Sequence, residues 1–258
     1  MTTPYVRFQV DGAVATITLA RAEKLNALDM PMIEALVDAA NAIEDSREIR
    51  CAIITGEGKA FCAGGDIAGW GVLEPLDMWR LWTRQGHRAF DRLARLRVPL
   101  IAALSGHALG GGLELAAAAD IRVAETQIKI GLPETGLGMV PGWSGTQRLV
   151  RRFGSQTVRR LSLTGALLSG EEAERQGIVD EVVPQGSALS RAHEIAARVA
   201  ERGPIAVSIA KELINAAEGE ETAAAVEGIA GALVSYTSDL KEGVASFREK
   251  RTPSYTNT

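Results

Sequence analysis

Two runs of consecutive apolar residues constrain the fold of this chain more than any other feature. Residues 51–55 and 100–104 form short runs that are mostly aliphatic, and glycine follows each run within two residues. Strands that are buried on both faces have this composition, and they occur mainly in parallel sheets with helices on both sides. Residues 14–19, which alternate and are rich in β-branched side chains, and residues 121–124 predict two more strands.

Helical patterns separate and follow these strands. Asp29 is a candidate N-cap, and apolar residues recur at helical spacing after it, at Met32, Ile33, Leu36, Val37, Ala40 and Ile43. Residues 113–119 predict a second helix, and strands that alternate with helices indicate an α/β fold with parallel pairing. Beyond about residue 142 the pattern is helical with Gly breaks, in residues 145–153, 155–163, 170–176, 189–202 and 205–249.

Charge and composition exclude several classes of function. The net charge of -4 argues against binding to nucleic acids or acidic membranes. Two cysteines cannot build a disulfide framework and suggest a reducing compartment. Because we find neither an apolar stretch that spans a membrane nor the pattern of a signal peptide, we expect a cytoplasmic protein with no membrane partner.

Two glycine-containing segments are suited to binding a negatively charged oxygen. Gly110, Gly111 and Gly112 precede a predicted helix, whose first amides are unpaired and lie at the positive end of its dipole. Ala63-Gly64-Gly65 follows a buried strand and also exposes backbone amides. If the N–H groups of Ala63 and Gly111 converge, they form an oxyanion hole. The alternative for both segments is a plain tight turn.

Two glutamates accompany these segments. Glu114 lies in the first turn of the predicted helix, and Glu134 follows Pro133 in a loop. Two carboxylates in one water-poor cleft would have different proton affinities, as an acid and base pair requires. Taken singly, Glu114 is also explained as a helix-start residue and Glu134 as an exposed loop residue. Their order along the chain with both amide segments is the stronger indication.

These motifs resemble the crotonase (enoyl-CoA hydratase/isomerase) superfamily over essentially the whole chain, closest to the enoyl-CoA hydratases. The matching stretches are residues 24–28, 61–66, 108–116, 132–134, 137–142, 145–149 and 247–251. The resemblance implies an α/β fold, a crotonase spiral of ββα units with a helical C-terminal trimerisation region. We expect the spiral core in residues 1–195 and the helical region in residues 196–258. The resemblance also implies a homotrimer or a dimer of trimers.

The resemblance implies roles for individual residues. The amides of Ala63 and Gly111 would hold a thioester oxygen, and Glu114 and Glu134 match both acids of the hydratase pattern. Coenzyme A, which is part of the substrate and not a prosthetic group, would contact Lys24, Ala27, Gly65, Asp66, Phe247 and Lys250. We therefore expect a hydro-lyase of fatty acid metabolism that reversibly adds water, with syn geometry, to a 2-trans-enoyl-CoA and gives a 3-hydroxyacyl-CoA. An enoyl-CoA isomerase, or other CoA-enolate chemistry on the same fold, is the alternative.

Two positions depart from the hydratase pattern: Gly65 stands where Ala is usual, and Trp143 stands where a small residue is typical. Residues 67–97 are the least family-like and contain Trp70, Trp79 and Trp82. A bulky or aromatic acyl group would explain these indoles, with Trp79, Trp82 and Trp143 as pocket residues. Core or subunit packing explains them equally well.

A basic stripe supports a function of another class. Arg80, Arg84, Arg88 and Arg92 recur at i, i+4 spacing and would suit a nucleic-acid backbone, although a solvated face is the ordinary interpretation. The acidic net charge argues against nucleic acid as a partner. The histidines, His87, His107 and His193, are too scattered in the sequence to suggest a metal site.

Overall fold

The computed structural model of the protein describes residues 4–220 and 222–258. The first half of the chain contains β1 (Val6–Asp11), β2 (Val14–Leu19), η1 (Ala22–Lys24), α1 (Met30–Asp45), β3 (Cys51–Gly56), β4 (Ala60–Cys62), α2 (Ile67–Trp70), α3 (Pro75–Asp77), η2 (Met78–Thr83), α4 (Arg84–Ala94), β5 (Leu100–Leu104), β6 (His107–Leu109), α5 (Gly111–Ala116) and β7 (Ile121–Glu125). The second half contains β8 (Lys129–Gly131), η3 (Glu134–Leu137), α6 (Gly145–Phe153), α7 (Ser155–Thr164), β9 (Leu167–Ser169), α8 (Gly170–Arg175), β10 (Glu181–Val183), α9 (Ala188–Ala200), α10 (Pro204–Ala217), α11 (Thr222–Ser235) and α12 (Ser238–Glu249).

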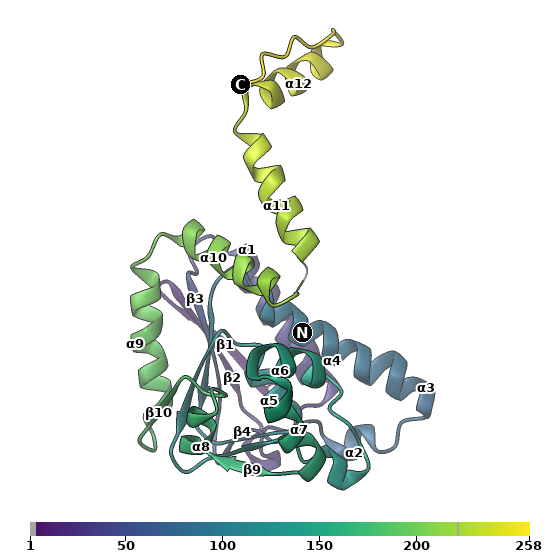
Figure 1. Cartoon of the computed structure of the whole chain (residues 1–258), viewed down its shortest axis with the longest axis vertical. Coiled ribbons are helices and arrows are strands. Elements are labelled where there is room, and N and C mark those ends of the chain that lie inside the picture. The colour runs from purple at the N-terminus through teal and green to yellow at the C-terminus, as the bar shows by residue number, and fades with distance from the viewer. Residues whose placement is uncertain (1–3, 221) are drawn as a thin grey trace. The chain divides into compact units, whose positions relative to one another are not determined.

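The strands form two sheets (Figure 1). The larger sheet has the order β1-β2-β3-β5-β7-β10, and all its neighbours are parallel except the β1–β2 hairpin. The smaller sheet has the order β4-β6-β8-β9, with β4, β6 and β8 parallel and β9 antiparallel.

The chain alternates between the two sheets. β3 lies in the larger sheet and β4 in the smaller one, and β5 with β6 and β7 with β8 repeat this step. Helices follow each pair before the chain returns to the larger sheet. This succession of two strands and a helical segment is the spiral of ββα units that the resemblance implies, and the α/β prediction is confirmed.

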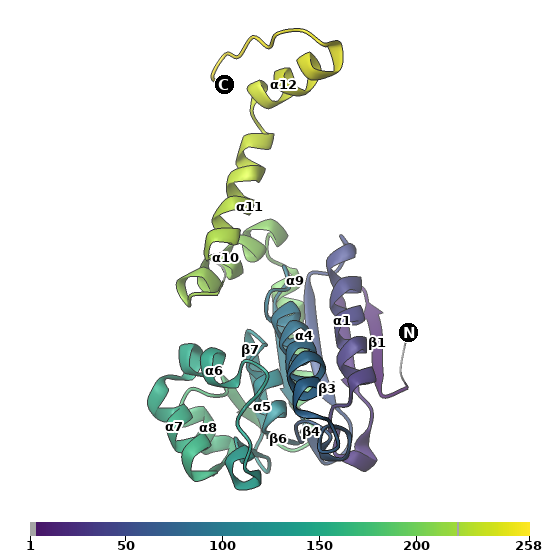
Figure 2. The same cartoon turned by 90° about the vertical axis from the view of Figure 1, so that its right-hand side faces the viewer.

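Both faces of the larger sheet are buried. On one face, the side chains of Cys51, Ile53 and Ile101 pack against alanines of α9. On the other face, Ala52 and Ile54 join the main core, which also contains the apolar sides of α1 and α4. These two helices lie side by side (Figure 2). Burial on both sides explains why β3 is apolar at nearly every position.

Local signals account for the first helix. Asp29 is its N-cap, and its carboxylate accepts a hydrogen bond of 3.0 Å from the amide of Met32. Pro31 occupies the first turn, where its missing N–H costs no hydrogen bond. The residues on the predicted apolar face are buried, apart from the partly buried Val37. The predicted helix therefore begins where the sequence indicates.

The chain divides into two compact units, residues 1–211 and 212–258. In the second unit, Thr237 is the N-cap of α12, and the chain end folds back on that helix. The Asp239 carboxylate accepts hydrogen bonds from the amides of Thr256 and Asn257, at 2.7 and 2.9 Å. Arg251 and Glu242 add an ion pair. The expected boundary between residues 195 and 196 stays a prediction.

Candidate active site

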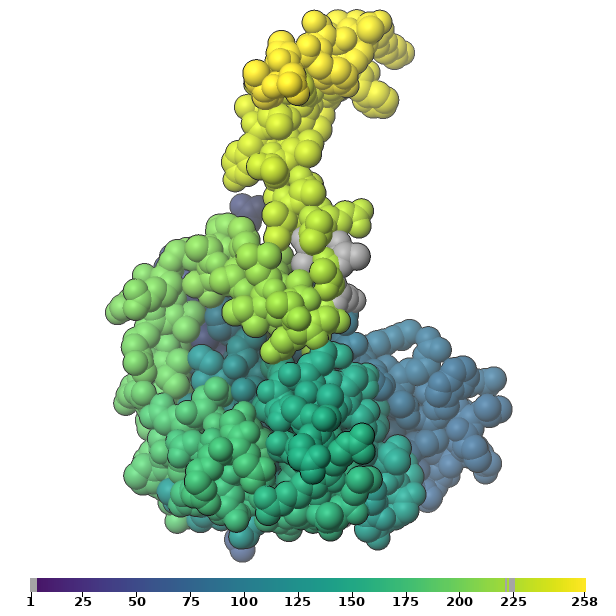
Figure 3. All heavy atoms as spheres, viewed as in Figure 1, coloured from purple at the N-terminus to yellow at the C-terminus, as the bar shows by residue number. Residues whose placement is uncertain are grey.

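A cavity of about 430 Å³ lies in the first unit. It lies between the segment that contains α2 to α4 and the loops that precede α6. Figure 3 shows that the blue segment of α3 and α4 adjoins the teal segment of α6 and α7 at the surface. The residues that line the cavity fall in four parts of the chain, 63–70, 78–87, 110–114 and 133–147.

Three of these parts begin at neighbouring strands of the smaller sheet. Residues 63–66 follow β4, residues 110–114 follow β6, and residues 132–134 follow β8. These strands are parallel and adjacent in the order β4-β6-β8. Because parallel strands end at the same edge of a sheet, the fold brings the two glycine segments and both glutamates to one place.

The two glycine segments lie in contact. A Cβ atom on Gly64, whose φ is +101°, would lie 3.3 Å from the Gly111 nitrogen. A Cβ atom on Gly112 would lie 1.9 Å from the Cys62 carbonyl oxygen, so only glycine fits there. The close approach that glycine allows places the start of α5 directly beside Cys62 and Gly64.

The Ala63 amide does not contribute to an oxyanion hole in this structure. Its N–H donates a hydrogen bond of 3.0 Å to the Leu25 carbonyl. By contrast, the N–H groups of Gly65 and Gly111 have no hydrogen-bond partner in the part of the chain that the structure describes. Gly111 is the first residue of α5, where a free amide is expected. The available pair of donors is therefore Gly65 with Gly111, which corrects the predicted pair of Ala63 with Gly111.

Glu114 is held rigidly at the cavity. Its side chain is buried, and Oε1 accepts two hydrogen bonds of 2.7 Å, from the amides of Trp143 and Gly145. A Cβ atom on Gly145 would lie 2.3 Å from that oxygen. Burial raises the pKa of Glu114 to about 7, although the two amides oppose this shift, and the nearby charge of Glu134 raises the pKa further.

Glu134 is held differently. It is the first residue of η3, and both carboxylate oxygens are buried without a hydrogen-bond partner within the described chain. Oε1 would lie 3.2 Å from a Cβ atom on Gly110. Burial raises the pKa of Glu134 above its ordinary value. An unpartnered, buried carboxyl is costly, and such a group in a cavity is a candidate for binding a water or a ligand.

The turn that holds Glu114 is anchored from α4. Ser144 lies between the two donating residues in a left-handed conformation, with φ of +74°. Its hydroxyl oxygen is 2.8 Å from Nδ1 of His87 and donates to Asp91 at 3.3 Å. Arg148, which is buried, donates to the same Asp91 oxygen at 2.6 Å. Sequence reasoning missed this network because its members lie on separate helices.

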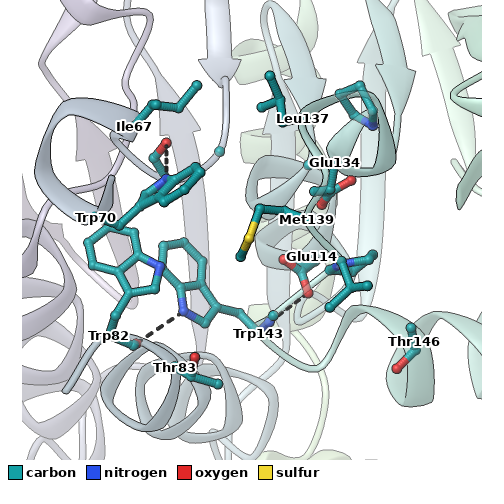
Figure 4. Close-up of a pocket in the computed structure, with 18 of the residues that line it drawn as sticks. Ile67, Trp70, Trp82, Thr83, Glu114, Glu134, Leu137, Met139, Trp143 and Thr146 are labelled. Carbon is teal, nitrogen blue, oxygen red and sulfur yellow. Dashed lines mark hydrogen bonds between the residues drawn. The ribbon is translucent and has the colours of Figure 1, made fainter. Parts of the chain in front are cut away.

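Tryptophans form one side of the cavity (Figure 4). Trp82 and Trp143 are buried, with ring centroids 5.0 Å apart, and both line the cavity together with Trp70. Trp79 does not line it. That side chain is 55% exposed and lies under the guanidinium of Arg84. The expectation for Trp79 is therefore corrected, because the turn of η2 directs Trp82 inward instead.

The expected coenzyme A residues lie in both units. In the first unit, Lys24 is exposed and Ala27 is partly buried. Asp66 is the N-cap of α2, and its carboxylate forms an ion pair of 2.9 Å with Arg21. In the second unit, Phe247 is 86% exposed and Lys250 ends α12 with a positive φ.

Other predicted features have structural partners of their own. In the arginine stripe, Arg84 lies over Trp79, and Arg92 donates a hydrogen bond of 3.1 Å to Asn41.

Within residues 4–220 and 222–258, no cluster of His, Cys, Asp and Glu has the arrangement of a metal site. None of the helices in that part of the chain is long and apolar enough to cross a membrane.

Comparison with known proteins identifies the family. Residues 9–258 match the model of the enoyl-CoA hydratase/isomerase family. The chain belongs to this family. A probable enoyl-CoA hydratase of Mycobacterium bovis is 37% identical, with 100% of both chains covered. A short-chain-enoyl-CoA hydratase of Clostridium acetobutylicum is 36% identical over 95% of each chain.

Solved structures of similar proteins have the same fold. The crystal structure of an enoyl-CoA hydratase from Bacillus anthracis matches with a TM-score of 0.81 and 36% identity, over 98% of this chain and 100% of that one. DspI of Pseudomonas aeruginosa matches with a TM-score of 0.83 and 33% identity, over 98% and 97%. The crotonase fold is thus established for this chain.

Proposed function

We propose that the protein is an enoyl-CoA hydratase, which reversibly adds water to a 2-trans-enoyl-CoA and forms a 3-hydroxyacyl-CoA. One observation carries this proposal: two glutamates with buried carboxyl groups, and two amides that have no partner in the described residues, line the same cavity. Family membership and relatives named as hydratases support the reaction class. A member of the family that lacked one of the two carboxyls would be less suited to water addition.

In this proposal, the amides of Gly65 and Gly111 bind the thioester oxygen. Negative charge develops on that oxygen as the hydroxyl adds to Cβ, because the electrons of the double bond move toward the carbonyl. Preorganised donors stabilise this charge more than they stabilise the ground state. Loss of one such donor typically lowers the rate by a factor of roughly 10²–10³.

The two glutamates move the protons. Glu114, ionised, accepts a proton from water while the water oxygen bonds to Cβ. Glu134, protonated, gives its proton to Cα, and the carbon–carbon double bond becomes a single bond. A proton then passes from Glu114 to Glu134 through solvent and restores the starting state. Since burial raises the pKa of Glu114 to about 7, this carboxyl can exchange protons near neutral pH.

Steady-state kinetics test the proposal directly. Crotonyl-CoA and longer enoyl-CoAs should lose their enoyl-thioester absorbance and yield 3-hydroxyacyl-CoA, identified by mass spectrometry. A shifted double bond without water addition would assign an isomerase instead. No reaction on any chain length, with thioesters still bound, would reject the hydratase.

We propose further that Lys24, Ala27, Gly65, Asp66, Phe247 and Lys250 contact the coenzyme A moiety. Lys24 and Lys250 carry positive charges suited to phosphates, and Phe247 offers an exposed apolar ring. Lys24→Ala and Lys250→Ala should raise KM for the CoA thioester more than they lower kcat. Unchanged KM in both variants would remove these contacts.

The assembly is also a proposal, a homotrimer or a dimer of trimers. The second unit exposes large apolar side chains, including Leu233, Tyr236 and Phe247, and subunit contacts commonly cover such surfaces. Light scattering on the eluting protein would give the mass, and a monomer would contradict the proposal. We place the enzyme in the cytoplasm, which agrees with two free, buried cysteines.

A further inference from the structure

The side of the cavity opposite the loop of Glu134 contains a packed cluster of indoles. Trp143 donates from Nε1 to the Trp82 carbonyl at 3.2 Å, and Trp70 donates from Nε1 to the Gly65 carbonyl at 3.3 Å. Their polar N–H groups are therefore bonded to the backbone. What Trp70 contributes to the cavity is the apolar surface of its ring, whereas Trp143, which is 3% exposed, lines the cavity as a closely packed side chain.

Three glycines make room for this cluster. A Cβ atom on Gly86 would lie 2.1 Å from Nε1 of Trp143, and one on Gly111 would lie 2.9 Å from its six-membered ring. A Cβ atom on Gly65 would lie 2.6 Å from Trp82 and 3.3 Å from Trp143. Each separation is shorter than ordinary contact, so these positions and the indoles depend on one another.

This dependence explains why two positions depart from the hydratase pattern together. A methyl group at position 65, where the pattern has alanine, would clash with Trp82. The small residue typical of position 143 would leave the space between Gly86 and Gly111 empty. Gly65 and Trp143 are therefore parts of one packing arrangement, and it includes the residues that hold the oxyanion donors.

The indole of Trp143 sets the floor of the site. Its ring lies against both Gly65 and Gly111, and beneath it Phe90 packs edge-on, with centroids 5.3 Å apart. An acyl group whose thioester oxygen binds those two amides cannot extend down into the core. It must extend along the indoles, between Trp70 and Ile67 of α2 on one side and the side chains of Leu137 and Met139 on the other (Figure 4).

We propose that this site selects an enoyl-CoA whose Cβ carries a flat apolar ring, such as a phenyl group, over one with a short alkyl chain, and that Trp143 is the specificity-determining residue. The inference rests on the proposed function for the position of the thioester. Aromatic rings stack on indole surfaces with a gain beyond that of buried area, whereas the terminal methyl of a crotonyl group is too small to cover them.

Binding of saturated thioesters tests the acyl preference separately from hydration, since these molecules cannot react. Isothermal titration calorimetry would compare 3-phenylpropanoyl-CoA, hexanoyl-CoA and butanoyl-CoA. We expect the phenyl compound to bind about tenfold more tightly than butanoyl-CoA, and more tightly than hexanoyl-CoA. Equal affinity for the phenyl and butanoyl compounds would overturn the inference, and so would equal affinity for the phenyl and hexanoyl compounds.

Two matched variants test whether Trp143 produces the preference for a phenyl group. Trp143→Leu keeps an apolar side chain but removes the ring, and it should reduce the phenyl-to-butanoyl affinity ratio to about threefold or less. Phe153→Leu is the control, because Phe153 is also a buried aromatic residue but lies outside the cavity. The phenyl-to-butanoyl affinity ratio of Phe153→Leu should equal that of the unaltered protein. A ratio that Trp143→Leu leaves unchanged would overturn the role of Trp143.

Turnover separates this inference from the proposed function. Cinnamoyl-CoA and crotonyl-CoA would be compared as substrates, with the reverse dehydration measured from the 3-hydroxy thioesters. Hydration of crotonyl-CoA with weak binding of phenyl thioesters would keep the hydratase and reject the acyl class. Tight phenyl binding without hydration of either enoyl thioester would keep the acyl class and reject the hydratase.

Discussion

The two glutamates at the cavity occupy contrasting environments. Glu114 lies in a helix and receives two backbone hydrogen bonds of 2.7 Å on one oxygen. Glu134 lies in the short η3 turn, and neither of its buried oxygens has a partner in the described residues. The structure thus provides one carboxyl whose position and charge are fixed by amides and one that keeps its full hydrogen-bonding capacity.

This difference indicates a division of roles. Burial raises the pKa of Glu114 to about 7 although backbone donors oppose the shift, so this carboxyl, with Oε1 fixed by two amides, can take up a proton near neutral pH. Glu134 has no such donors from other residues, so both of its oxygens are available to bind a water or, in the proposed reaction, to pass a proton to the substrate. In the proposed reaction, two glutamates that each follow a short strand of the smaller sheet would form the proton-transfer pair.

Removing either carboxyl should have the largest effect. Glu114→Gln and Glu134→Gln should each lower kcat by a factor of roughly 10²–10⁴, the usual contribution of a positioned acid or base. Binding of a saturated acyl-CoA should persist in both variants. Glu125→Gln is the control, since Glu125 is also buried but lies outside the cavity, and it should retain activity. Full activity in either cavity variant would refute the assigned role.

The second largest effect should be a pH dependence of stability that comes from Glu114. Its folded-state pKa of about 7 lies above the value of 4.5 for an unperturbed glutamate. The stability from its protonated form is therefore fully present below about pH 4.5 and is lost as pH rises to about 7. Relative to the Glu114→Gln variant, the free energy of unfolding of the unaltered protein should fall by up to about 3 kcal/mol over this pH interval. Urea unfolding at several pH values would measure the free energy of unfolding of both proteins. The same pH dependence in both would contradict the prediction.

Substitutions at Ser144, in the turn that holds Glu114, should have a smaller effect on stability and kcat. Ser144→Ala removes the hydrogen bonds to His87 and Asp91 and places a Cβ atom at φ of +74°, whereas Ser144→Gly removes the bonds but tolerates the conformation. We expect the alanine variant to be less stable than the glycine variant by about 1 kcal/mol. It should also have the lower kcat, because the amides of Trp143 and Gly145 lose their alignment. Equal stability and kcat in the two variants would show that a Cβ atom at this positive φ does not strain the turn.

The smallest effect should come from the charge of Glu134 acting on Glu114. That charge raises the pKa of Glu114, so Glu134→Gln should move the midpoint of the pH-dependent stability loss toward lower pH. The comparison uses the same unfolding curves and does not depend on residual activity. A midpoint that moves toward higher pH would mean that the two carboxyls do not repel each other.

The sequence predicted the long elements well and the short ones poorly. The buried strands β2, β3, β5 and β7 and the capped helix α1 have periodic or continuous apolar patterns, and they were predicted. The strands β4, β6 and β8 have three residues each, too few to show a period. These short strands nevertheless position the candidate site.

The site itself was predicted by resemblance more than by pattern. Glu114 and Glu134 line the cavity, but nothing local in the sequence distinguishes them from other glutamates. The Ala63 amide was assigned wrongly because its partner, the Leu25 carbonyl, comes from a distant segment with left-handed residues. Trp79 was assigned wrongly because helix phase around η2 could not be predicted within one residue.

The smaller sheet also fixes the distances between the chemical groups at the candidate site. Gly65, Gly111 and Glu134 follow adjacent parallel strands, whose spacing in any sheet is about 4.8 Å. A slip of one residue along β4, β6 or β8 would shift one chemical group by about 3.3 Å relative to the others, which exceeds the tolerance of a hydrogen bond. Insertions in the long connections between spiral turns leave this spacing intact. The fold can therefore vary the side chains that line the cavity, as the indoles here show, without changing the spacing of these three groups.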